Sequence, residues 1–303
     1  MLRQTFLFLS RHRRLRRWFE TSRHAGRLTA RFIAGENLDD VMLVVRRLHA
    51  ARLLATVDHL GENVTTASEA ISSREVMERT LDAIAGSSLP ATVSIKLTQF
   101  GLDLSDGLCV ENVSVLARQA AAIGSRVEID MEASEYVDRT LAVVEKLHAE
   151  FGCVRCVLQA YLHRTLDDAR RMNALGIPVR LCKGAYKEPP AIAFPEKARV
   201  DENYVALSRL LLDAGAYPAF ATHDPRMIAA VREHAARTGR TPADFEFQML
   251  YGIRRDLQQQ LVEQGFRVRL YVPYGDAWYP YFMRRLAERP ANVFFIARNL
   301  LRA

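Results

Sequence analysis

The sequence has few cysteines and lacks the long apolar runs that membrane proteins carry. Four cysteines among 303 residues fit a reducing compartment, and a chain of this length buries enough surface to fold without disulfides. No apolar run approaches the roughly 20 residues that a membrane-spanning helix needs, and the run at residues 6–9 is too short for a signal-peptide core. We therefore expect a cytoplasmic protein, with peripheral contact at the inner face of the membrane left open.

Signatures of metal and nucleic-acid binding are missing as well. Cys153 and Cys156 have CxxC spacing, but no second CxxC or His pair accompanies them, so buried thiols are the simpler interpretation. His59 and His223 each lie beside an aspartate, yet the HxH and HExxH patterns of metal-dependent hydrolases are missing. Neither RNP nor helix-turn-helix signatures occur. We expect no metal site and no nucleic-acid partner.

The net charge of +7 comes from the beginning of the chain. Residues 1–50 hold eleven Arg and four Asp or Glu, so the rest of the chain is neutral overall. The basic run at residues 11–19 has two open interpretations: an amphipathic segment that contacts anionic lipid, or a solvated helix face packed beside the folded domain.

From residue 51 onward, short apolar or β-branched runs alternate with longer helical patterns. Eight such repeats indicate parallel strands joined by helices, and eight strands close a barrel. The competing fold, an open doubly wound sheet, usually carries a Gly-rich phosphate turn, which this sequence lacks. We predict an α/β fold, a (β/α)8 TIM-type barrel over residues 51–303 after an N-terminal helical extension over residues 1–50. The predicted strands are residues 54–58, 92–97, 126–131, 154–160, 178–183, 219–223, 245–250 and 268–272, and the predicted helices between them are residues 74–84, 110–123, 136–148, 166–175, 198–214, 227–238 and 254–264.

Polar residues recur where these strands end, which is the face on which barrel enzymes build their active sites. Polar groups that converge on a buried barrel end must pair with one another or bind a ligand, and both interpretations stay open for any single residue. The residues at these positions are Asp58, Glu62, Lys96, Asp130, Glu132, Gln159, Arg180, Lys183, Thr222, His223, Gln248 and Tyr271.

A helix predicted at about residues 278–288 adds a second polar feature. Tyr281, Arg284, Arg285 and Glu288 follow helical spacing and share one face. Two adjacent guanidinium groups at a barrel mouth make a good clamp for a carboxylate. The alternative is a surface ion pair between Arg284 and Glu288.

Blocks of sequence at nearly every strand end resemble those of the proline dehydrogenase family. The similarity runs in order over about residues 50–297, and its length is similar to the monofunctional bacterial branch. The blocks are TVDHLGE at 56–62, SIKL at 94–97, IDME at 129–132, QAYL at 159–162, RLCKGAY at 180–186, ATHD at 221–224, EFQMLYG at 246–252, YVPYG at 271–275 and YFMRRLAE at 281–288.

The resemblance implies a flavoprotein with FAD across the strand ends. Small residues at positions 184 and 185 would permit close approach of the cofactor, and the cations at 180 and 183 would neutralise its pyrophosphate or the reduced ring. The implied FAD-binding residues are Met131, Gln159, Arg180, Lys183, Gly184, Ala185, Thr222 and His223.

The resemblance also implies oxidation of L-proline to Δ1-pyrroline-5-carboxylate, the first step of proline catabolism, with electrons passing from FAD to a membrane quinone. Asp130 and Arg180 are the implied catalytic residues, with Asp130 setting the charge and position of Lys96. Lys96, Arg284 and Arg285 are expected to hold the proline carboxylate, and Tyr271 and Tyr281 to pack around its ring.

Three further expectations remain. Glu62 and Arg284 are expected to pair as a gate over bound proline. A Schiff-base aldolase, with Lys96 or Lys183 as nucleophile, is the alternative enzyme. A barrel whose basic arm binds membrane or nucleic acid is the alternative outside enzymes; liposome flotation or a salt-sensitive gel shift would reveal it.

Overall fold

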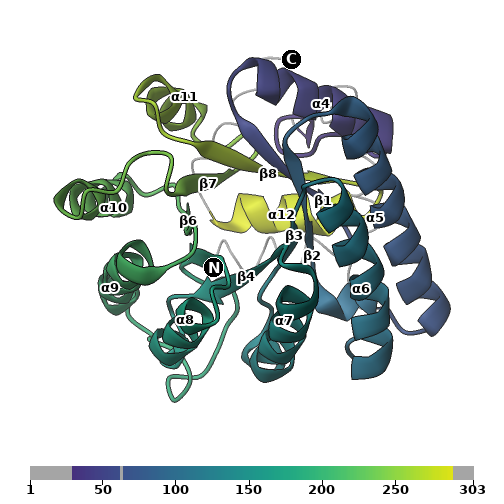
Figure 1. Cartoon of the computed structure of the whole chain (residues 1–303), viewed down its shortest axis with the longest axis horizontal. Helices are drawn as coiled ribbons and strands as arrows, with labels where there is room; N and C mark the ends of the chain where they lie inside the picture. The colour runs from purple at the N-terminus through teal and green to yellow at the C-terminus, as the bar shows by residue number, and fades with distance from the viewer. Residues whose placement is uncertain (1–28, 62–63, 289–303) are drawn as a thin grey trace.

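Eight parallel strands close into a barrel, with helices arranged around it (Figure 1). The computed structural model describes residues 29–61 and 64–288, and residues 284–288 by their backbone alone. Each strand pairs with its neighbour in sequence, and β1 pairs with β8 to complete the ring. The strands are β1 (Leu54–His59), β2 (Ala91–Ile95), β3 (Val127–Ile129), β4 (Val154–Gln159), β5 (Val179–Cys182), β6 (Ala219–Ala221), β7 (Glu246–Leu250) and β8 (Val268–Tyr274).

The predicted barrel is confirmed, and each predicted strand and helix has an observed counterpart. The helices are α4 (Leu38–Ala50), α5 (Ala67–Ser87), α6 (Asp106–Ala122), α7 (Val137–Phe151), α8 (Thr165–Ala174), α9 (Lys197–Ala214), α10 (Pro225–Arg237), α11 (Arg255–Glu263) and α12 (Trp278–Glu288), with short 3-10 turns at Leu97–Phe100 and Ser134–Tyr136. The largest difference is α5, which begins seven residues before its predicted start. A capping box explains the earlier start: the Thr66 side chain accepts from the backbone N–H of Glu69, whose carboxylate accepts from that of Thr66.

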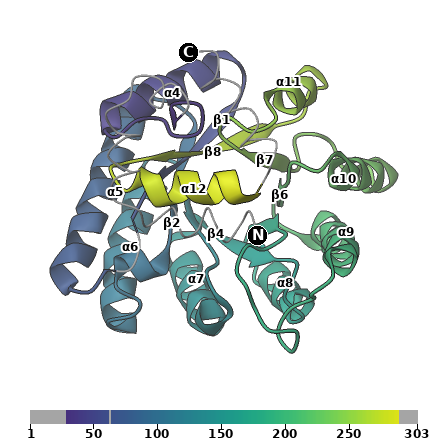
Figure 2. The same ribbon diagram turned by 180° about the vertical axis from the view of Figure 1, so that it is seen from behind.

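The helix that follows β8 does not pack on the outside of the barrel. Figure 2 shows α12 crossing the barrel end, whereas α4 packs against the outside of β1 and β8. The apolar face of α4, with Val41 and Val45 almost fully buried, joins the main core. Because β8 leads directly into α12, the covered end is the one at which the strands finish. The helix preceding the barrel therefore fills the place of its eighth outer helix.

Residues 29–36 link these two helices across the rim. The N–H of Ala34 donates to the carbonyl of Pro273, and the N–H of Gly275 donates to the carbonyl of Gly35. The Trp278 indole at the start of α12 donates to Glu36 at 3.0 Å. Gly252 has a φ of +77°, and a Cβ there would lie 1.8 Å from the Arg31 carbonyl oxygen, so only glycine fits.

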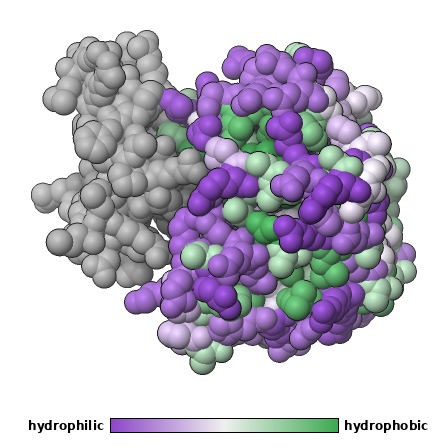
Figure 3. All heavy atoms as spheres, turned by 90° about the vertical axis from the view of Figure 1, so that its left-hand side faces the viewer, coloured by the Kyte–Doolittle hydropathy of each residue, from purple (hydrophilic) through white to green (hydrophobic). Residues whose placement is uncertain are grey.

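The outer face over α9, α10 and α11 is mostly hydrophilic, with hydrophobic residues scattered among polar ones (Figure 3). Among the described helices, none combines the length and apolar character needed to span a bilayer. The basic run at residues 11–19 lies outside the described residues, and the expected boundary at residue 50 stays a prediction.

Candidate functional site

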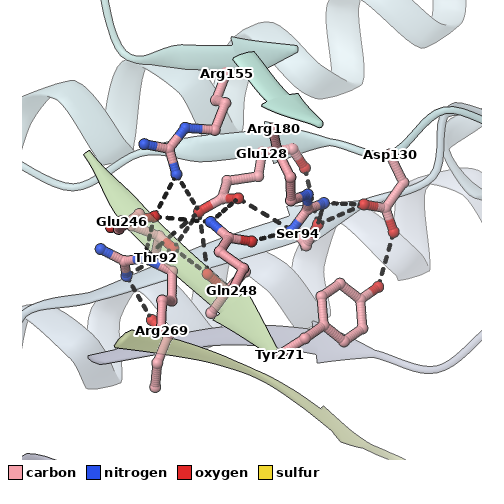
Figure 4. A network of polar contacts seen from close by, with 12 residues as sticks. Thr92, Ser94, Glu128, Asp130, Arg155, Arg180, Glu246, Gln248, Arg269 and Tyr271 are labelled. Atoms are coloured by element: carbon pink, nitrogen blue, oxygen red, sulfur yellow. Dashed lines mark hydrogen bonds and ion pairs between the residues drawn. The ribbon is translucent and has the colours of Figure 1, made fainter. Parts of the chain in front are cut away.

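A lysine, an aspartate and a tyrosine meet at the end of the barrel where the strands finish. Lys96 follows β2, Asp130 follows β3, and Tyr271 lies on β8. The Lys96 ammonium is 3.2 Å from Asp130 Oδ2 and 3.2 Å from the Tyr271 hydroxyl, which donates to Asp130 at 2.8 Å. The fold thus brings three of the predicted site residues together, and Figure 4 shows Tyr271 directed at Asp130.

Arg180 extends from β5 into the same cluster. Its guanidinium pairs with Asp130, donates to Ser94 at 2.9 Å and to Gln248 at 3.2 Å, and lies 3.0 Å from Glu128 Oε2. The Arg180 side chain is 5% exposed. A planar fork with five donors satisfies several acceptors at once, so one residue joins the barrel mouth to the barrel interior.

The electrostatics of the cluster keep both Lys96 and Asp130 ionised. Burial raises the pKa of Asp130, but Arg180 and Lys96 more than offset this, and the net shift is downward. Burial lowers the pKa of Lys96, yet Asp58, Tyr271 and Asp130 raise it well above its ordinary value. A Schiff-base nucleophile requires a lysine with a depressed pKa. The aldolase alternative is therefore unfavourable at Lys96.

Asp58 is the least satisfied carboxylate of this cluster. It is 1% exposed at the end of β1, with Oδ1 3.6 Å from the Lys96 ammonium. Its Oδ2 is buried with no hydrogen-bond partner among the described residues. Burial raises the pKa of Asp58, partly offset by Lys96. A buried acceptor with spare capacity at the mouth is a feature that a hydrogen-bonding ligand could satisfy.

Beneath the mouth, the barrel interior contains an ion network that the sequence prediction missed. Arg155 on β4 lies 2.6 Å from Glu246 on β7, and these strands are not neighbours, so the pair crosses the interior. Arg269 on β8 lies 2.9 Å from Glu246, and Arg155 lies 3.4 Å from Glu128 on β3 (Figure 4). The signal was present in the sequence: each residue stands alone between apolar neighbours in a strand with both faces buried.

The segment after β5 carries three of the predicted cofactor residues. The Lys183 ammonium pairs with Asp201 and lies 3.1 Å from Asp224. Gly184 and Ala185 are exposed. Gly184 has a φ of +111°, and a Cβ there would lie 2.1 Å from the Tyr161 ring. This position therefore requires glycine, because the chain runs flat against Tyr161.

The remaining four predicted cofactor residues outside β5 and the segment after it lie at three other strand ends. Met131 is buried after β3. Gln159 at the end of β4 donates to the carbonyl of Glu132 at 2.9 Å. The Thr222 hydroxyl accepts from the N–H of Asp224 at 3.1 Å. His223 Nε2 accepts from the N–H of Leu250 at 2.9 Å, which fixes this ring nitrogen as an acceptor.

The predicted clamp and gate are only partly described. Tyr281 is 8% exposed on α12, in an apolar cluster that includes Phe32, Leu60 and Ile253. The side chains of Arg284 and Arg285 lie outside the described part of the chain, although their backbone belongs to α12. Glu62 lies outside the described residues altogether. The carboxylate clamp and the gate stay predictions.

From the lowered pKa values of the two glutamates in the network, we predict that the protein loses stability in acid. Burial raises the pKa of Glu128 and of Glu246, but the surrounding arginines reverse this and lower both below the ordinary 4.5. The unfolded chain thus binds protons before the native state does, so their stabilisation is present above pH 4.5 and is lost as pH falls toward the folded pKa. Burial raises the pKa of Asp58 and of Glu132 instead, which opposes this effect, whereas the pKa of Asp130 is lowered like those of the two network glutamates.

Urea titrations from pH 7 to pH 3 would measure this effect. We expect the free energy of unfolding to decline below about pH 4.5, the ordinary glutamate pKa. The Glu246→Gln variant provides the control, because it removes one of the two groups and should give a shallower decline. A wild-type free energy that is flat down to pH 3 would contradict the assignment.

Comparisons with known proteins agree on one family. The sequence model described as proline dehydrogenase matches residues 41–298. The chain is 41% identical over 303 residues to proline dehydrogenase 1 of Bacillus subtilis (strain 168), covering all of both chains. It is 39% identical over 280 residues to the proline dehydrogenase of Deinococcus radiodurans, covering 91% of this chain and 90% of that one.

A solved structure with the same fold belongs to a longer protein. Proline utilization A (PutA) from Bdellovibrio bacteriovorus, inactivated by N-propargylglycine, superposes with a TM-score of 0.82 at 27% identity. The match covers 87% of this chain and 33% of that one, so this chain corresponds to about a third of PutA.

Proposed function

The chain belongs to the proline dehydrogenase family, and from this premise we propose that it is an FAD-dependent enzyme that oxidises L-proline to Δ1-pyrroline-5-carboxylate. The observation that best supports the proposal is the cluster of Lys96, Asp130, Arg180 and Tyr271 at the barrel end covered by α12. We further propose a membrane quinone as the acceptor of the electrons, with contact at the inner face of the membrane through the basic beginning of the chain.

The residues present fit FAD as the cofactor. Gly184 and Ala185 are exposed and directly follow Lys183 after β5, a combination suited to an anionic dinucleotide that approaches the backbone closely. When bound, FAD supplies the two-electron acceptor for the hydride that leaves proline. Met131, Gln159, Thr222 and His223 complete the proposed contacts around it.

The substrate residues would bind and orient proline. Lys96 carries a positive charge held by Asp58 and Asp130, and with Arg284 and Arg285 it would fix the substrate carboxylate. Tyr271 and Tyr281 would exclude water from the ring, so that the reacting carbon keeps one orientation. Glu62 and Arg284 would close over the bound substrate as a gate.

An anaerobic visible spectrum tests the cofactor and the substrate together. The purified protein should show flavin absorption bands that bleach when proline is added, and a soluble quinone should restore them. A protein that cannot be reconstituted with FAD would overturn the cofactor. Flavin bands that proline leaves unchanged would overturn the substrate, and a reduced flavin that quinone cannot reoxidise would overturn the acceptor.

The Tyr271→Phe variant tests the contribution of one hydroxyl. We expect proline turnover to fall about 10-fold, because a hydrogen bond to a charged group contributes about 1.5 kcal/mol. Tyr274→Phe is a matched control on the same strand, since its hydroxyl contacts Thr80 on α5 at 2.7 Å and neither Lys96 nor Asp130. Steady-state reduction of an acceptor dye measures both variants. Equal effects would show that Tyr271 acts through barrel stability alone.

A further inference from the structure

The charges inside the barrel require an explanation that stability does not provide. Interiors of this fold are ordinarily filled with branched apolar side chains. Here Glu128, Arg155 and Glu246 are fully buried, and Arg269 is 6% exposed. Desolvation makes buried ion pairs costly, and apolar replacements are often at least as stable. We therefore expect this network to hold particular side chains in position rather than to stabilise the fold.

Glu128 connects the interior network to the mouth. Its Oε1 accepts from Thr56 at 3.1 Å and from Thr92 at 3.0 Å and lies 3.4 Å from Arg155. Its Oε2 lies 3.0 Å from the guanidinium of Arg180, which in turn pairs with Asp130. One carboxylate thus has an oxygen toward the interior and an oxygen toward the residue that reaches the mouth (Figure 4).

Glu246 has the same charge and burial and shares Arg155 with Glu128, but it has no ion pair with Arg180 among the described residues. It pairs with Arg155 at 2.6 Å and with Arg269 at 2.9 Å, on the opposite side of Glu128 from Arg180 (Figure 4). The two glutamates form a natural comparison, because removing either one adds the same positive charge to the interior. Only the loss of Glu128 removes a direct contact to Arg180.

We propose that Glu128 is a positioning residue: its carboxylate fixes the Arg180 guanidinium between Asp130 and Gln248, in the orientation that the mouth requires. Arg155 and Arg269 serve this arrangement by keeping Glu128 ionised inside the barrel. The inference rests on the proposed flavin chemistry, in which Arg180 faces the cofactor. Without Glu128, Arg180 keeps Asp130 as its carboxylate partner and shifts toward the mouth.

Three variants, each loaded with flavin and assayed below its melting temperature, test this role. They are Glu128→Gln, Glu246→Gln and the double variant Glu128→Gln with Arg155→Met, which restores the charge balance of the interior without restoring the contact to Arg180. Glu128→Gln should lower kcat for proline at least 10-fold with a smaller change in KM, since small misplacements of catalytic groups are costly. Glu246→Gln should lower kcat less than about 3-fold, because Glu246 makes no direct contact with Arg180 among the described residues.

The double variant separates positioning from charge balance. We expect Glu128→Gln also to shift the midpoint potential of the bound flavin. If Glu128 positions Arg180, kcat stays low in the double variant, and the midpoint potential stays shifted from the wild-type value. If charge balance alone matters, both quantities return toward wild type, and the proposal is overturned. Equal kcat losses in the two single variants would also overturn it. A wild-type flavin that proline fails to bleach would instead refute the proposed function, so the two failures are distinguishable.

Discussion

Replacing Arg180 with Lys is expected to lower proline turnover by about 10²- to 10³-fold, the cost of removing a preorganised electrostatic contact from an active site. A lysine keeps the positive charge but presents a point charge on a flexible stem. It cannot reach Asp130, Ser94 and Gln248 together, as the guanidinium does. Rapid-mixing measurements of flavin reduction by proline would isolate the step that the substitution slows.

The control is an Arg→Lys substitution at a position outside the mouth. Arg267 precedes β8 at the opposite end of the barrel and donates to the Tyr217 hydroxyl at 3.1 Å. Arg267→Lys should leave flavin reduction within about 2-fold of wild type, as expected for a surface change. An Arg180→Lys variant that retains a third or more of the wild-type rate would show that the shape of the guanidinium is unimportant.

The Arg155→Met variant should lose about 3–5 kcal/mol of stability, the usual cost of leaving a buried charge without its partner. Arg155 is fully buried between Glu128 and Glu246, and its removal leaves two buried carboxylates with fewer cations. A loss of this size corresponds to a fall in melting temperature of roughly 5–8 °C for a chain of 303 residues. Urea unfolding followed by circular dichroism would measure the free energy.

An exposed ion pair provides the comparison for that measurement. Arg170 pairs with Asp167 at 3.2 Å, with side chains 62% and 84% exposed. Arg170→Met should cost less than about 1 kcal/mol, because water screens exposed pairs. A loss below about 1 kcal/mol in Arg155→Met would mean that the interior carboxylates find other partners or take up protons.

The barrel and the ring of polar strand ends could be predicted because each rests on a local pattern. Eight repeats of a strand pattern followed by a helix pattern predict the fold class. Residues that end the parallel strands of a barrel must share one face. Lys96, Asp130 and Tyr271 were placed correctly at the mouth for this reason. Pairing across the interior depends on which strands face each other through the barrel, and no local pattern reveals that Arg155 meets Glu246.

No local pattern predicts that α4 fills the eighth outer place of the barrel. The apolar face of α4 predicts a packed helix but does not say which strands it covers. The helix at residues 278–288 was expected at the barrel mouth from its guanidinium pair, but the cluster that holds α12 there, with Ile33, Leu60 and Ile253, follows no local pattern. Leu60 and Ile253 belong to βα loops, whose conformations are set by tertiary packing.

The contacts between residues 31–36 and residues 252–278 have a consequence for synthesis on the ribosome. Arg31 and Gly252 are 221 residues apart, and Glu36 and Trp278 are 242 apart. At about 5–20 residues per second, roughly 10–50 s pass between the synthesis of α4 and that of β8, the second of the two strands that α4 covers. During that interval the part of its apolar face that packs against β8 lacks this partner. Final assembly is thus a late event that joins the two extremes of the described chain.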